Sequence, residues 1–142
     1  MVRRYTRSRS KSRGKIDWIN APLVKKRVDG LIDRFEMVSF QKERIFTFSS
    51  TNANTRAIAR IWGLSKIWQQ ALGFEPAYII EVISEKFDRL SESQKDEVLL
   101  HELAHIPQNF SGALAPHKRG KGHFHDKLKK LLAAYRGSFW GN

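Results

Sequence analysis

The sequence predicts an α+β fold, a small domain in which helices pack against a short mixed sheet. Apolar residues repeat at helical spacing in some segments, and in others they alternate or form β-branched runs. The length of 142 residues fits one domain. We expect this domain to span residues 16–142, after a basic tail at residues 1–15.

The segment before the first predicted strand is expected to be helical. Residues 22–40 carry apolar residues every three or four positions, and Asn20 lies near the expected cap, although Gly30 weakens the prediction. Residues 44–49 then alternate in the manner of a short strand, before the turn-rich residues 49–54.

A second helix is predicted over residues 55–72, because its apolar residues would cover one broad face. Gly73 is the expected C-terminal stop of this helix. Trp62 and Trp68 are expected to pack in the core instead of contacting a ligand.

The second half of the domain is predicted to contain one strand and two helices. Residues 77–84 form a β-branched run, which indicates a strand. Ser91 and Gln94 fit a capping box, so a helix should begin near residue 92 and continue to about residue 106. Residues 121–136 are expected to form the last helix.

The helix predicted at residues 92–106 carries the sequence His101-Glu102-Leu103-Ala104-His105, the spacing found in zinc peptidases. Residues i and i+4 share a helix face, so both imidazoles can reach one ion at about 2.1 Å. Glu102 is offset by one position, where it could take a proton from a metal-bound water as the general base. The alternative is a chance pattern on a polar surface. Apolar neighbours argue against it, because burying an unpaired Glu is costly.

Two histidines need a third protein ligand. Residues 106–116 contain no His, Asp, Glu or Cys, so the first available donor is His117. Pro107 should end the helix, and Gly112 and Pro116 should shape a loop that returns His117 to it. His117 is therefore the predicted third ligand.

Later donors remain alternatives, namely His123, His125 and Asp126. His123 and His125 are expected to be exposed polar residues, or partners for the oxygen that gains charge in the transition state. The metzincin pattern is excluded, because Gln108 and Ser111 occupy the places of its Gly and third His.

The net charge of +12 is the second feature of the sequence that points to a function. Seven basic residues in the tail are unopposed by any acid, and without them +5 remains for residues 16–142. These candidate nucleic-acid contacts are Arg3, Arg4, Arg7, Arg9, Lys11, Arg13 and Lys15. We expect the tail either to be a solvated, disordered segment or to order on RNA or DNA, with acidic lipid a weaker alternative. Tyr5 adds a stacking surface that favours nucleic acid.

A second basic cluster follows His117, and it either extends the same surface or is a solvated face. It consists of Lys118, Arg119, Lys121, Lys127, Lys129 and Lys130.

The composition narrows the location of the protein. The chain has no Cys, which excludes thiolate ligands, disulfides and a cysteine nucleophile. No apolar run reaches the roughly 20 residues of a membrane span, and no signal-peptide core follows the basic N-terminus. We expect a cytoplasmic protein that has no membrane partner.

Several segments together resemble a known family. The strand Tyr78-Ile79-Ile80-Glu81-Val82, the motif with its Pro107, and His117 after Phe110-Ser111-Gly112 are similar to the metallopeptidases of archaea and phages, which are zincin-like and SprT-related. The resemblance covers roughly residues 44–117. It implies a zincin-like fold, zinc at His101, His105 and His117, Glu102 as base, and the strand at residues 78–84 as the edge that pairs with an extended peptide.

Two functional hypotheses follow. In the first, the protein is a zinc-dependent hydrolase of peptides or proteins, and the retained Glu102 favours this hypothesis. In the second, zinc is structural and the protein is an RNA-bound component of a ribonucleoprotein such as the ribosome, which the charge favours.

Overall fold

The computed structural model describes residues 14–117 and 123–140 and shows a mixed α+β fold, which confirms the predicted class. The strands are β1 (Asp17–Asn20), β2 (Ile45–Thr51), β3 (Ala59–Gly63) and β4 (Tyr78–Ile83). The helices are α1 (Pro22–Arg34), α2 (Lys66–Leu72), α3 (Ser84–Phe87), α4 (Glu92–Ala104) and α5 (His123–Trp140), with a 3-10 turn at Lys42–Arg44.

The four strands form one mixed sheet in the order β1-β2-β4-β3. β2 and β4 are parallel, whereas β1 and β3 pair antiparallel with β2 and β4. The inner strand β4 is apolar at five of its six positions, as expected for a strand with neighbours on both sides. β3 lies at an edge. The prediction that residues 78–84 form the edge strand is therefore wrong, because β4 is enclosed by β2 and β3.

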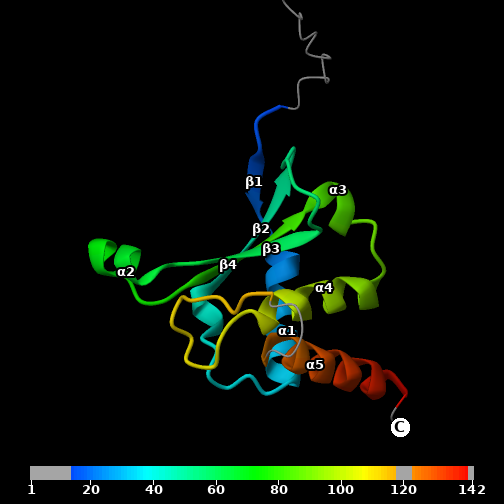
Figure 1. Ribbon diagram of the computed structural model, residues 1–142. Helices are drawn as coiled ribbons and strands as arrows, with labels where there is room; N and C mark the ends of the chain where they lie inside the picture. The colour runs from blue at the N-terminus through cyan, green and yellow to red at the C-terminus, as the bar shows by residue number, and fades with distance from the viewer. Residues whose placement is uncertain (1–13, 118–122, 141–142) are drawn as a thin grey trace, which may run out of the picture.

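Helices α1 and α4 pack on one face of the sheet, and α5 packs on the side of α4 away from the strands (Figure 1). Between them and the strands lies the hydrophobic core, in which Val28, Ile80, Leu99, Leu100 and Leu103 are fully buried. The other face carries no helix among the described residues, and α2 lies beyond the ends of β3 and β4 (Figure 1).

Several elements agree with the sequence predictions. Both predicted strands are present as β2 and β4, and α4 begins with the predicted capping box, in which Ser91 accepts from the Gln94 N–H at 3.2 Å. α5 occupies the segment of the last predicted helix. Gly73 ends α2 in the left-handed conformation, at φ 67°.

The predicted helix over residues 55–72 is wrong for its first part, and only its end, Lys66–Leu72, is helical as α2. Residues 59–63 form β3 instead, because they pair with β4, with Ile61 opposite Ile80. Trp62 and Trp68 are 49% and 58% exposed, so neither belongs to the core. The spacing of apolar residues fitted a helix, but the partner strand that decides the conformation lies fifteen or more residues further along the chain.

The first helix is shorter than predicted, since α1 ends at Arg34. Glu36 follows with a positive φ of 51°, which an α-helix cannot contain. β1 and α3 were not predicted, because four residues are too few to show a periodic pattern.

Most of the predicted basic tail lies outside the described residues, from Arg3 to Arg13, and Lys15 is described and exposed. Lys118, Arg119 and Lys121 of the second basic cluster also lie outside them. No helix in the described part of the chain is long and apolar enough to cross a membrane.

A buried ion pair stabilises the uncovered face of the sheet. Glu81 of β4 is 1% exposed and accepts from Arg60 Nε at 2.6 Å and from Trp62 Nε1 at 2.9 Å, with Trp18 Nε1 at 3.3 Å. Burial alone would raise the pKa of Glu81, but the hydrogen bonds from Arg60 and Trp62 outweigh it and hold the pKa at about 2.

We therefore expect Glu81→Gln to make the free energy of unfolding less dependent on pH in the acid range. The folded-state pKa lies below the ordinary value of 4.5, so the stabilisation by the carboxylate is present above that pH and is lost as the pH falls toward about 2. Urea unfolding at pH 7 should show a loss of about 3 kcal/mol in the variant. The difference should narrow by pH 3, and Glu43→Gln, at an exposed position, should show neither effect. A difference that stays constant from pH 7 to pH 3 would contradict this role of Glu81.

Candidate metal centre

α4 presents the first three site residues toward the sheet. Leu99, Leu100 and Leu103 anchor the helix in the core, so its rotation is fixed. His101 and His105 lie one turn apart on one face, with ring centroids 5.3 Å apart. His105 and Glu102 are buried, at 6% and 7% exposure, and His101 is half-buried.

The loop after Pro107 returns to α4, as predicted. Its return is fixed by two hydrogen bonds between the same residues: Ala115 N–H donates to the His105 carbonyl at 2.7 Å, and His105 Nδ1 donates to the Ala115 carbonyl at 2.6 Å. The second bond leaves Nε2 of His105 free of a proton and available as a ligand. Two residues later, His117 Nε2 lies 3.4 Å from His101 Nε2.

The far end of this loop is held by β3, α2 and β4. The Tyr78 hydroxyl accepts from Gly112 N–H and donates to the Ala113 carbonyl, both at 2.8 Å. Gln69 Nε2 donates to the Ser111 carbonyl at 2.9 Å. Gly63 packs directly on the Gly112 carbonyl, where a Cβ on Gly63 would collide with it. The position of His117 therefore depends on residues distant in the sequence.

Phe124 of α5 closes one side of the histidine cluster. Its ring stacks on His105, with centroids 4.1 Å apart, and meets His117 edge-on at 4.7 Å. Sequence reasoning missed this residue. The available signal was an apolar residue between two histidines at the start of the last predicted helix.

Two of the three imidazoles, His101 and His105, have a lowered pKa. Burial, with a smaller contribution from the neighbouring His105 and His117, lowers the pKa of His101 to about 4. Burial also lowers the pKa of His105. At neutral pH both rings are neutral and keep a lone pair for coordination.

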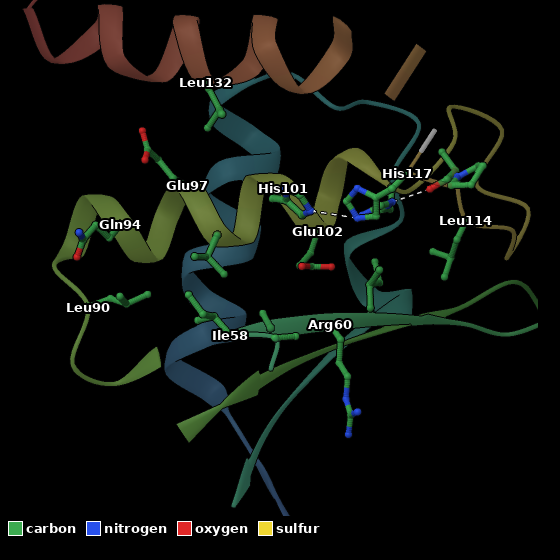
Figure 2. A pocket seen from close by; sticks show the side chains of 17 residues that line it. Ile58, Arg60, Leu90, Gln94, Glu97, His101, Glu102, Leu114, His117 and Leu132 are labelled. Atoms are coloured by element: carbon green, nitrogen blue, oxygen red, sulfur yellow. Dashed lines mark hydrogen bonds between the residues drawn. The ribbon is translucent and has the colours of Figure 1, made fainter. Parts of the chain in front are cut away.

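Glu102 is buried in the cleft between α4 and β3 (Figure 2). Burial raises its pKa to about 7, since the charged carboxylate loses hydration. A cation held by the histidines would favour the carboxylate form and bring the pKa down again. A base with a pKa near neutrality is suited to proton transfer at physiological pH.

The cluster fits a tetrahedral metal ion. Two nitrogens bound at about 2.1 Å to such an ion are separated by about 3.4 Å, and the Nε2 atoms of His101 and His117 are 3.4 Å apart. One donor atom from each of His101, His105 and His117 lies within 4.8 Å of the others. Among the described residues, this is the one group of His, Asp and Glu side chains close enough together to hold a metal ion.

The alternative ligands are not part of this cluster. His125 and Asp126 are exposed on α5, and the His125 ring packs beside Phe124 at 5.5 Å. The side chain of His123 lies outside the described residues. The structure therefore brings together the three predicted ligands and places Glu102 beside them.

A cleft of about 960 Å³ opens in front of the histidines. One wall is formed by Ala57 and Ile58 and by the first three residues of β3, Ala59 to Ile61, and the opposite wall by α4 (Figure 2). Side chains of a strand alternate between two faces, so three consecutive lining residues of β3 show that its backbone itself borders the cleft. Ile58, Leu114 and Leu132 make much of the remaining lining apolar.

Three histidines at an open cleft, with a buried glutamate beside them, form a candidate metal site. The chain belongs to the family described as "Putative phage metallopeptidase", whose model matches residues 16–135. No curated protein and no solved structure matched the chain. The family agrees with the predicted resemblance, while the finer kinship to zincin-like, SprT-related proteins stays a prediction.

We expect His117→Ala to lower the affinity for zinc by about tenfold or more, because one of three nitrogen donors is lost. His125→Ala is the matched control, since it removes an imidazole from the same neighbourhood but outside the cluster. A competition titration against a chelator measures both variants. A larger loss of zinc affinity in His125→Ala than in His117→Ala would show that His117 is not the third ligand.

Proposed function

We propose that the protein is a zinc-dependent peptidase. The observation that carries this proposal is the convergence of three imidazoles on one point beside a buried glutamate, at the edge of an open cleft. The family to which the chain belongs supports the same reaction class.

Zinc suits these donors better than calcium or magnesium. The donors are nitrogens, whereas calcium and magnesium prefer cages of oxygen ligands. His101, His105 and His117 would hold the zinc, and three protein ligands leave a fourth position for water or substrate. When bound, zinc would lower the pKa of that water and polarise the peptide carbonyl.

Glu102 has the chemical role of general base in this proposal. Its carboxylate would accept the proton of the attacking water and deliver it to the amine that leaves. Glu102 is buried among apolar residues, which favours transfer of the proton to the leaving group over its loss to solvent.

Lys127 of α5 has a structural role. Its Nζ donates to the Ile106 carbonyl at 2.9 Å, so it holds the turn after α4 instead of entering the cleft.

The edge strand β3 is the proposed substrate platform. Its outer edge has no neighbouring strand among the described residues, and its backbone borders the cleft. An extended peptide could add to this edge through main-chain hydrogen bonds, which recognise any sequence. Such a peptide would lie across the cleft in front of Glu102.

We expect Glu102→Gln to retain zinc and lose peptide hydrolysis, because glutamine keeps the shape of the side chain but cannot accept the proton. The loss should be at least about a hundredfold in kcat/KM. Zinc content by elemental analysis and turnover of an unstructured protein substrate are measured on the same samples.

Equal turnover in wild type and Glu102→Gln would rule out the proposed base. Bound zinc with no hydrolysis in either form would support the alternative, a non-catalytic, ribosome-associated protein with a structural zinc. A protein that neither contains zinc nor is stabilised by adding it would overturn both.

We propose in addition that the basic tail binds nucleic acid, with RNA favoured. The specific observation is its charge, since seven basic residues in residues 1–15 are unopposed by acids. Phosphate contacts of this kind release counterions and give affinity without sequence specificity. The tail would then hold a peptidase domain on nucleic acid.

Deleting residues 1–15 should flatten the salt dependence of RNA binding. Each phosphate contact contributes about 0.7 to 0.9 to the slope of log affinity against log salt concentration. Titrations of full-length and truncated protein with RNA at several salt concentrations give both slopes. Removing zinc should alter binding less than the deletion does. Identical slopes would show that the tail does not bind phosphate.

A further inference from the structure

The face of the sheet opposite the helices exposes large aromatic side chains. Trp18 of β1, Phe46 of β2 and Trp62 of β3 are 54%, 47% and 49% exposed, and Ile79 of β4 is 37% exposed. The register places these residues on one face, because Trp62 pairs with Ile79, and Ile79 with Phe46. Exposed apolar patches of this kind in soluble proteins mark binding surfaces. We call Trp18, Phe46, Phe48, Trp62 and Ile79 the aromatic face.

Glu81 fixes the two tryptophans of the aromatic face. Both indole N–H groups point to its carboxylate, Trp62 at 2.9 Å and Trp18 at 3.3 Å, so neither ring is free to rotate. The Arg60 guanidinium lies 5.0 Å from the centre of the Trp62 ring and holds it from one side. Rings that are already ordered lose little entropy when a ligand stacks on them.

In the described part of the chain, the aromatic face presents no unpaired acid that would repel a polyanion. Among the described strand residues that alternate to this face, Glu81 is the single acid, and its charge is buried and paired with Arg60. Lys15 precedes Trp18 by three residues, so the seven basic residues of the tail lead directly into the strand that carries Trp18. The positive charge and the aromatic rings therefore adjoin along the chain.

The aromatic face and the metal centre lie on opposite sides of β3. Ala59 is buried toward α4, whereas the Arg60 side chain points away from the cleft (Figure 2). A ligand on the aromatic face would not cover the histidines. Both sites could be occupied at once.

We propose that the aromatic face binds single-stranded nucleic acid by base stacking. Phe46, Trp62 and Trp18 would each accept a base, while the tail contacts the phosphates. Every base has a π-face, so this binding tolerates any sequence, but it requires bases that are not stacked in a duplex. The inference rests on the proposed nucleic-acid binding of the tail and adds to it the kind of strand that is bound.

The test uses the full-length protein and a fluorescently labelled oligouridine, with a duplex RNA of equal length as the comparison. Phe46→Ala removes an outward ring without touching Glu81, and Trp62→Ala removes the ring that is hydrogen-bonded. Trp68→Ala is the matched control, since Trp68 is a 58% exposed tryptophan on α2, beyond the sheet (Figure 1). Trp62→Phe keeps a ring at position 62 and tests whether stacking alone is sufficient.

We expect Phe46→Ala and Trp62→Ala each to weaken oligouridine binding by about tenfold at every salt concentration, with the slope against salt unchanged. Trp62→Phe should recover most of that loss, and Trp68→Ala should bind like wild type. Duplex binding should be the same in all four variants. Thermal unfolding of each variant checks that the fold is intact.

The tail and the aromatic face can fail separately, because the tail determines the slope and the rings determine the affinity at fixed salt. Wild-type oligouridine affinity in both Phe46→Ala and Trp62→Ala overturns the proposal, even where deletion of the tail flattens the slope. An equal loss for duplex RNA also overturns it. Dissociation of a dimer in the alanine variants, with unchanged RNA affinity, would assign the face to a second copy of the chain.

Discussion

The candidate metal centre depends on the paired hydrogen bonds between His105 and Ala115. They close the loop that begins at Pro107 onto the end of α4, and they orient the His105 ring through its Nδ1. Without that closure, the end of the loop next to His117 would be free to move, because Tyr78 and Gln69 hold only its far end. The two bonds thus set the direction of one ligand and help to place its neighbour.

The sheet separates two surfaces that differ in chemistry. Toward α4, the edge strand β3 contributes its backbone and small or aliphatic side chains to the cleft. On the other side the same strand carries Arg60 and Trp62 beside a buried carboxylate. Because strand residues alternate, five residues suffice to border a cleft and to support an aromatic surface.

The sequence predicted the elements whose signals are local. The capping box at Ser91 and the β-branched run of β4 each lie within a few residues, and the spacing of His101 and His105 needs a single helix. The bend that returns His117 could be anticipated from Pro107 and Gly112. β3 could not be predicted in this way. Its apolar residues at positions 58, 61 and 62 also fit a helix, and its conformation depends on pairing with β4.

Contacts between side chains distant in the sequence were likewise beyond local reasoning. Phe124 against His105 and the two tryptophans at Glu81 bring together residues from different elements. Glu81 looked like one polar residue in an apolar strand. Its low pKa arises from Arg60 and Trp62 on β3, so no pattern within β4 could reveal it.

The contact between Gly63 and Gly112 has a mechanical consequence. Both residues meet through backbone atoms, so no side-chain rotamer can change to relieve pressure on the contact. A displacement of β3 would therefore press on the loop that carries His117. The edge of the sheet and the third histidine are thus mechanically connected through a backbone contact.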